Sequence, residues 1–158
     1  CLDFAAVAGS TKITNNKGGS AMVSRLNPYL NFRNSARQAM DFYKSALGGE
    51  LHVSTFGDSG MPGDPSEAGN IMHSQLETPA GFTLMASDTP KAMGEPSPNG
   101  SISISGDDEA ELRGYWDKLS DGGTVIMPLT PAPWGDTFGM FTDKFGVGWL
   151  VNIAGKKG

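Results

Sequence analysis

The chain has 158 residues, a formal net charge of -5 at pH 7, one cysteine and two histidines. This length suits one domain, or two small repeats that share a core. One cysteine excludes an internal disulfide and a cysteine-rich zinc module, and two histidines exclude a three-histidine metal site within one chain. The isoelectric point near 4.9 argues against nucleic acid as a partner, because nucleic-acid binding needs a basic surface.

The ends of the natural domain and its location are predicted from composition. No apolar run approaches the ~20 residues that span a bilayer, so we expect no membrane partner and a cytoplasmic location. Residues 1–21 end in the linker-like run Lys17-Gly18-Gly19-Ser20-Ala21, directly before Met22. We expect 1–21 to be an appended tag or fusion and 22–158 to be the natural domain. The alternative is that 1–21 form an N-terminal arm that packs on a partner subunit.

After Met22 the pattern predicts a strand, a helix and three further strands. Asn27–Phe32 alternates polar and apolar residues, which indicates a strand with one buried face. Apolar residues then recur at helical spacing from Asn34-Ser35 to about Leu47, and Gly48-Gly49 ends the helix. The three strands are predicted at Glu50–Phe56, Ile71–Glu77 and Phe82–Ser87, with a loop at 57–70.

The same order of signals returns in the second half of the chain. Ser101–Ser105 alternates serine and isoleucine, and Asp107-Asp108 begins a helix that runs to about Leu119. Three strands are predicted at Thr124–Met127, Asp136–Thr142 and Val147–Ile153, with a proline-rich loop through Trp134. Residues 88–99 are rich in proline and glycine and read as a linker between the two units.

Two βαβββ units, at about 26–88 and 100–153, are therefore expected to pair into one α+β domain, since neither is large enough to bury its sheet alone. Side chains alternate between the faces of a strand, so Leu30, Phe32 and Ile102 should lie under the helices. The opposite face is then uncharged, with Asn27, Tyr29, Asn31, Met85, Ser87, Ser101 and Leu150 on it. Such a face is typical of a binding cavity, and the alternative is a solvated sheet face.

Particular runs of this sequence resemble a known superfamily. Asn27–Phe32 and Ala39–Gly49 resemble the glyoxalase/bleomycin-resistance (vicinal oxygen chelate) superfamily. Similarity to its PhnB-like branch lies in four later runs: Ile71-Met72-His73, Leu84–Asp88, Trp134–Met140 and Asp143–Trp149. The resemblance implies paired βαβββ modules whose sheets curl around a central cavity, usually in a homodimer. Proteins of this branch often carry the label 3-demethylubiquinone 3-methyltransferase-like.

The resemblance also implies where a metal would be held. Metal-dependent members place one ligand on the first and one on the last strand of each module, which falls here on Asn27, Met85, Ser101 and Leu150. None of these is a histidine, glutamate or aspartate, the ligands that zinc, iron and hard cations use. We therefore expect no superfamily metal and no other cofactor. A single divalent ion held by His73 and a second, unassigned side chain stays open.

Three residues invite a chemical interpretation. His73 is predicted on the cavity face with Gln75 and is the best titratable group for general acid–base work; the alternative is a hydrogen-bonded structural histidine. Trp134, on its proline-stiffened loop, can stack on a flat ligand or anchor the loop. Asp88 is placed to begin a turn, which we favour over contact with a ligand.

The function expected from these observations is metal-independent binding of a small aromatic or drug-like molecule in the inter-module cavity of a homodimer. The predicted ligand-binding residues are Asn27, Tyr29, Asn31, Gln75, Met85, Ser87, Ser101, Trp134 and Leu150. One alternative is an enzyme that uses His73, either a metal-assisted lyase or dioxygenase or a 3-demethylubiquinone methyltransferase-like protein. Another is a dimer scaffold with a vestigial pocket.

Overall fold

The computed structural model describes residues 24–60 and 63–156, so the predicted tag or arm at 1–21 lies outside the described residues. The first module contains β1 (Tyr29–Phe32), α1 (Ala36–Leu47), β2 (Glu50–Thr55), α2 (Phe56–Ser59), β3 (Ile71–Glu77) and β4 (Thr83–Asp88). The second contains β5 (Ser101–Gly106), α3 (Glu109–Ser120), β6 (Thr124–Pro131), β7 (Thr137–Thr142) and β8 (Gly148–Ile153). Short 3₁₀ turns at Pro65–Glu67 and Lys91–Met93 interrupt two of the connections.

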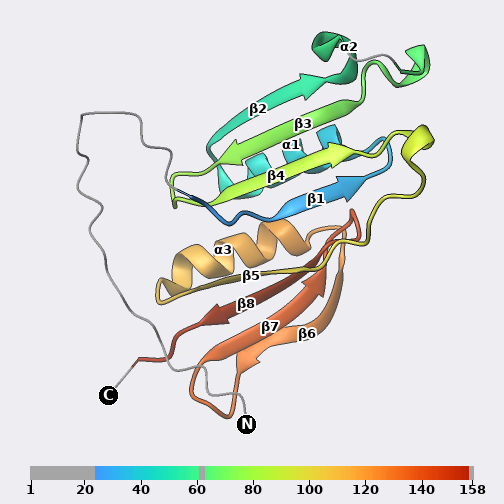
Figure 1. The fold of residues 1–158 in the computed structure, drawn as a ribbon. Coiled ribbons are helices and arrows are strands. Elements are labelled where there is room, and N and C mark those ends of the chain that lie inside the picture. Colours follow the sequence, from blue (N-terminus) through green and yellow to red (C-terminus); the bar gives the residue numbers. More distant parts are fainter. Residues whose placement is uncertain (1–23, 61–62, 157–158) are drawn as a thin grey trace, which may run out of the picture.

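The two modules have the same sheet topology, which confirms the α+β fold and the internal repeat. The strand orders are β1-β4-β3-β2 and β5-β8-β7-β6, and the first strand of each module runs parallel to its last. Equivalent residues occupy equivalent register positions, since Asn31 pairs with Ser87 and Ser105 pairs with Asn152. The edge strands β1 and β5 face each other across the boundary between the modules (Figure 1).

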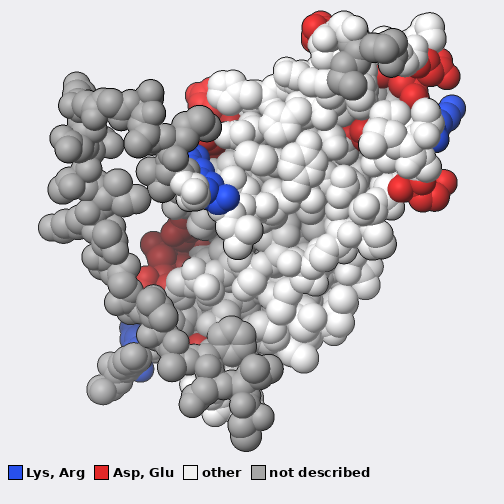
Figure 2. Space-filling model, viewed as in Figure 1, with Lys and Arg blue, Asp and Glu red and all other residues white. Residues whose placement is uncertain are grey.

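Each sheet has one face under a helix and one face that we call its open face. Leu30 and Phe32 are buried while Tyr29 is exposed, as the alternation in this strand predicts. In Figure 1, α1 lies behind the first sheet, so the open face of that sheet turns toward the viewer, and α3 is seen between β1 and β5. Figure 2, drawn from the same side, shows a broad uncharged area in the centre with acidic and basic side chains at the rim. The predicted uncharged face is therefore a feature of the folded chain.

One hydrophobic core serves both modules. The ring of Tyr43 on α1 lies 5.6 Å from the Trp149 ring on β8, and the Tyr43 hydroxyl donates to Asp143 at 2.7 Å. Phe145, between β7 and β8, packs against Phe32 and Phe42 of the first module. These contacts fix the two modules against each other and thereby set the width of the boundary between them.

The linker is held against the edge of β1. The side-chain amide of Asn99 accepts from the backbone N–H of Asn31 at 2.8 Å and donates to its carbonyl at 3.0 Å. The side-chain amide of Asn99 takes the place of a neighbouring strand here, so the backbone N–H and C=O of Asn31 at the β1 edge both have hydrogen-bond partners. The interpretation of 88–99 as a plain linker missed this contact.

Two local features differ from the sequence prediction. The run Pro128–Pro131 lies in β6 and not in a loop, because β6 is an edge strand, where a proline without an N–H is tolerated, and its register is irregular around Met127. The alternation in β3 predicts that Met72 lies under the helix with Leu76, but the β2–β3 register shifts between Ser54 and Thr55 of β2, and Ile71 is buried while Met72 is half-buried.

Within residues 24–60 and 63–156, none of the helices combines the length and the apolar character that a membrane crossing requires.

Candidate functional site

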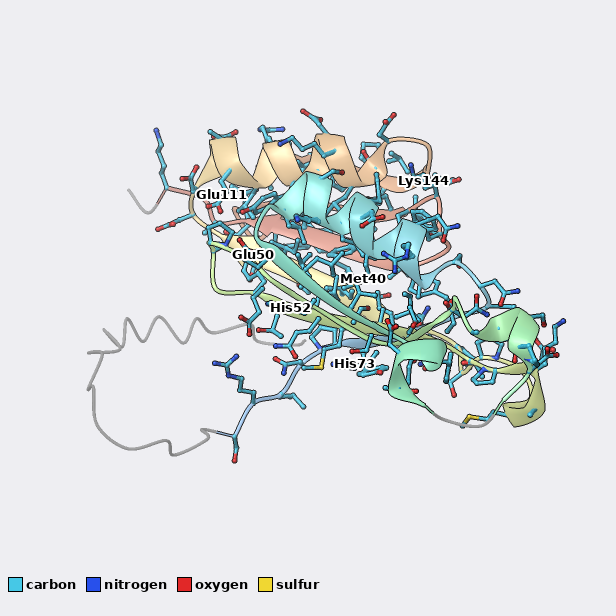
Figure 3. All side chains as sticks on the ribbon, turned by 90° about the horizontal axis from the view of Figure 1, so that it is seen from above. Met40, Glu50, His52, His73, Glu111 and Lys144 are labelled. Atoms are coloured by element: carbon cyan, nitrogen blue, oxygen red, sulfur yellow. The ribbon has the colours of Figure 1, made fainter. Side chains whose placement is uncertain are left out.

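The open face of the first sheet carries a hydrogen-bonded aromatic pair. The phenol oxygen of Tyr29 on β1 lies 3.1 Å from Nδ1 of His73 on β3, and the two rings stack with their centroids 5.8 Å apart. Figure 3 shows His73 on the side of the sheet away from α1, whereas Met40 of α1 lies on the helix side. His73 is half-buried and, as predicted, shares its face with Gln75. Nδ1 of the imidazole is thus engaged by Tyr29, and Nε2 has no partner among the residues that the structure describes.

The other predicted residues of this sheet surround the pair. Met85 stands opposite Tyr29 on β4, and Ser87 stands opposite Asn31. Met85, Ser87 and Asn31 are half-buried between fully buried neighbours, which places them on the open face. The amide nitrogen of Gln75 donates to Glu77 at 2.8 Å, so Gln75 is partly engaged within the chain. The second histidine, His52 on β2, for which the sequence indicates a structural or a solvent-facing role, is exposed.

The second sheet places its predicted residues on the equivalent face. Ser101 is exposed at the start of β5, opposite Gly148, while Leu150 is half-buried on β8. Trp134 is 60% exposed in the turn between β6 and β7, and its ring contacts Phe138 edge-on at 5.6 Å. Trp134 is therefore not buried as a core anchor.

A groove of about 690 Å³ runs along the boundary between the modules. Its deep wall is apolar, with Leu47, Leu84, Ile104 and the buried Trp149. Its outer wall includes Thr83 and Ser103, which belong to the open faces. At one end Arg25 lies 3.6 Å from Glu77, so the charges of the groove are confined to that end. Of the predicted ligand-binding residues, all of which the structure describes, Asn27 alone lines this groove.

Several groove residues were missed by the sequence prediction. Phe82 and Ile102 are half-buried lining residues, although their strand positions indicated core. They are accessible because the two sheets separate at the boundary, so residues under the helices reach its surface there. The sequence offers one indication that these two residues are accessible: both lie near the first residue of a strand, where a helix covers the sheet incompletely.

The positions that would hold a superfamily metal do not suit one. Met85 offers a thioether and Leu150 offers no donor atom, and both lie on open faces as expected. Asn27 and Ser101 supply only neutral oxygens. Within the part of the chain that the structure describes, no group of three or more histidine, cysteine, aspartate or glutamate side chains could hold a metal ion. The donor chemistry therefore does not fit the metal of the superfamily.

The buried carboxylate Asp88 has a structural role. Its oxygens accept from the backbone N–H groups of Ala36 at 3.0 Å and Ile71 at 2.9 Å, and the side chain is 4% exposed. We predicted that Asp88 begins a turn, but the structure shows that its carboxylate links the first residue of α1 to the first residue of β3. Asp88 is accordingly removed from the set of residues that can contact a ligand.

Two βαβββ modules that share one core and leave a groove at their boundary define a glyoxalase-type fold. Residues 25–151 match the Glyoxalase/Bleomycin resistance protein/Dioxygenase superfamily, and the chain belongs to this superfamily.

Three relatives define its neighbourhood. Protein YjdN of Escherichia coli K12 is 30% identical over 142 residues, which cover 81% of this chain and 94% of YjdN. Among solved structures, protein PA1353 from Pseudomonas aeruginosa is 41% identical with a TM-score of 0.75, covering 85% of this chain and all of that one. A PhnB protein from Bacillus cereus is 25% identical with a TM-score of 0.65, covering 83% of this chain and all of that one. The resemblance to the PhnB-like branch is thereby confirmed.

Proposed function

We propose that this protein binds a small, uncharged, largely apolar molecule, aromatic or drug-like, in the groove between its modules, and that no metal ion takes part. The observation that carries this proposal is the groove itself, which pairs an apolar deep wall with hydroxyl groups at its mouth. Its volume of about 690 Å³ lies in the range of small-molecule sites. Most of the binding free energy then comes from burying apolar ligand surface, and the polar groups orient the ligand.

The surroundings of the groove favour a neutral ligand. The charged residues of its lining, Arg25 and Glu77, lie at one end and pair with each other, and the rest of the lining is uncharged. An ion bound along the apolar wall would lose hydration without gaining a partner of opposite charge. The unsuitable donors at the superfamily metal positions support binding without a metal.

The test is the binding of N-phenyl-1-naphthylamine, a neutral apolar fluorescent probe. In Ser103→Trp an indole would fill the mouth of the groove, and we expect the probe's affinity to fall by about tenfold or more. Ser105→Trp is the matched control, since Ser105 lies on the same strand and face but is not among the lining residues of the groove. We expect wild-type affinity for this variant.

Two outcomes would contradict the proposal: equal affinity of the probe for Ser103→Trp and the wild type, or no binding by the wild type. The same titration after dialysis against a chelator tests metal independence. Loss of binding after dialysis, restored by a divalent ion, would show that a metal takes part.

A second candidate function is catalysis, favoured by the Tyr29–His73 pair. The phenol holds the imidazole in one orientation, as a general acid or base requires. If the chain is an enzyme, His73→Gln should lose the isomerisation of a thiol adduct of a 2-oxoaldehyde, which requires only proton transfer, and still bind the probe. A wild type that does not turn over this compound argues for binding alone. In an enzyme that uses His73, the substrate would contact the neighbouring residues of the open face, which are Tyr29, Asn31, Gln75, Met85 and Ser87. The alternative that the chain is a 3-demethylubiquinone methyltransferase-like protein stays a prediction.

We further propose that the protein acts as a homodimer. Its exposed large apolar side chains include Tyr29, Val125, Ile126 and Met127, which a second copy would cover. Three predicted ligand-binding residues lie outside the groove: Ser101, Trp134 and Leu150. In the dimer, they would contact a ligand that is held between their sheet and the second copy. The cytoplasmic location stays a prediction.

A further inference from the structure

The segment between the modules ends in the one Asn-Gly pair of the chain, Asn99-Gly100, directly before β5. In such a pair the backbone nitrogen of the glycine can attack the side-chain carbonyl carbon of the asparagine. A side chain on the second residue hinders this attack, whereas glycine has no Cβ and leaves the path open. The sequence therefore contains a single position of this reactive type.

The fold itself does not require a glycine at position 100. Gly100 is exposed, and a Cβ built on it would meet no heavy atom within 4 Å beyond its chain neighbours. Its φ lies outside the left-handed region that favours glycine, whereas Gly94 in the same segment has a φ of 84°. Neither packing nor backbone conformation explains this glycine, and alanine fits in its place.

The side chain of Asn99 uses both ends of its amide on one residue of β1, a two-bond contact that we call the Asn99 clasp. Its oxygen accepts from the N–H of Asn31 at 2.8 Å, and its nitrogen donates to the Asn31 carbonyl at 3.0 Å. Asn99 is half-buried, and β1 is the edge strand that faces β5 across the module boundary (Figure 1). An ionised aspartate only accepts hydrogen bonds, so it cannot make the second of these bonds.

We propose that Asn99 is a deamidation site and that its deamidation opens the Asn99 clasp. The nitrogen of Gly100 forms a bond to Cγ of Asn99, and its proton leaves with the side-chain nitrogen as ammonia. The product is a five-membered succinimide ring. Water then adds to either carbonyl carbon of the ring and breaks the bond from that carbon to the nitrogen, which gives aspartate or isoaspartate. No oxidant, reductant or cofactor is needed.

Both products weaken the contact between this segment and β1. A carboxylate oxygen faces the Asn31 carbonyl oxygen in place of a donor, so two acceptors meet where a hydrogen bond was. The isoaspartate product also lengthens the main chain by one methylene directly before β5. The site is separate from the proposed ligand groove, since neither Asn99 nor Asn31 is among the lining residues of that groove.

The Asn99 clasp also controls the rate of the reaction. The amide of Asn99 must turn from Asn31 toward the nitrogen of Gly100 before the attack, so both bonds of the clasp break first. Deamidation of the folded chain then proceeds through molecules whose segment has left β1. Its rate therefore reports a local opening of the fold.

Peptide mass spectrometry over a time course at mildly alkaline pH tests the reaction. We expect the peptide that contains Asn99 to convert to products with the mass of aspartate, about tenfold or more slowly in the folded chain than in guanidinium chloride. Gly100→Ala is the control, and its conversion should be slower than that of the wild type in guanidinium chloride. The proposal is overturned if folded wild type stays unmodified at Asn99, if it converts as fast as the unfolded chain, or if Gly100→Ala converts as fast as the wild type.

The variant Asn99→Asp provides the aspartate product directly, and thermal unfolding measures the effect on the fold. We expect its Tm to lie about 2–4 °C below that of the wild type, because a hydrogen bond is replaced by a contact between two acceptors. Asn34→Asp is the matched control, since it adds the same charge at an exposed side chain that accepts from Asn70 at 2.6 Å, a bond that a carboxylate keeps. Asn99→Asp as stable as the wild type, or no less stable than Asn34→Asp, would show that deamidation leaves the clasp closed.

Discussion

At the scale of single residues, Asp143 organises the contact between the modules. This carboxylate is 3% exposed and accepts from the Tyr43 hydroxyl and Trp149 Nε1, at 2.7 and 2.8 Å. The backbone N–H groups of Phe145 and Val147 donate to its other oxygen. A carboxylate only accepts hydrogen bonds, so four donors can satisfy a buried negative charge without a cation. Asp143 is therefore a structural residue, although buried carboxylates often mark active sites.

The Tyr43–Asp143 contact makes stability depend on alkaline pH. Burial, and then the charge of Asp143 and its hydrogen bond, raises the pKa of Tyr43 well above its ordinary value. The folded chain thus keeps a proton that the unfolded chain loses above about pH 10. The stability from Tyr43 is complete below that pH and falls by about 1.4 kcal/mol for each further pH unit.

Tyr43→Phe should therefore be about 1 kcal/mol less stable than the wild type at neutral pH. Above about pH 10 this difference should shrink and then change sign, because phenylalanine has no proton to lose. Urea unfolding of both proteins across this range measures it. Tyr115→Phe is the comparison, since burial and then Glu111 raise the pKa of Tyr115 only to about 12. An unchanged difference between wild type and Tyr43→Phe at every pH would refute the argument.

At the scale of elements, what the sequence could predict followed from periodicity. Leu30 and Tyr29 were assigned to opposite faces because strand side chains alternate, and this was correct. The strand through Pro128 was missed because proline ordinarily argues against a strand, and only the edge position of β6 permits it. The groove residue Ile102 was missed because its exposure depends on where two sheets separate, which no local pattern encodes.

The first helix depends on a residue distant in sequence. Ser35 precedes α1 but makes no side-chain capping bond, and Asp88 instead accepts from the N–H of Ala36. Asp88→Ala should cost about 2–4 kcal/mol, because two buried N–H groups lose their acceptor. Asp108→Ala removes an ordinary exposed cap from α3 and should cost about 1 kcal/mol. Chemical denaturation compares the two variants, and equal losses would show that Asp88 is no more than a local cap.

At the scale of the whole molecule, the shared core should make the two modules unfold as one unit. Met40 on α1 is fully buried, so Met40→Ala should cost about 2–5 kcal/mol. This loss should reach the second module, since α1 packs against Trp149 through Tyr43. Native-state hydrogen exchange measures it at Leu76 of β3 and Val151 of β8, and both amides should lose the same free energy of protection. If Leu76 alone lost protection, the modules would be separate folding units. The groove between them could then open without unfolding either module.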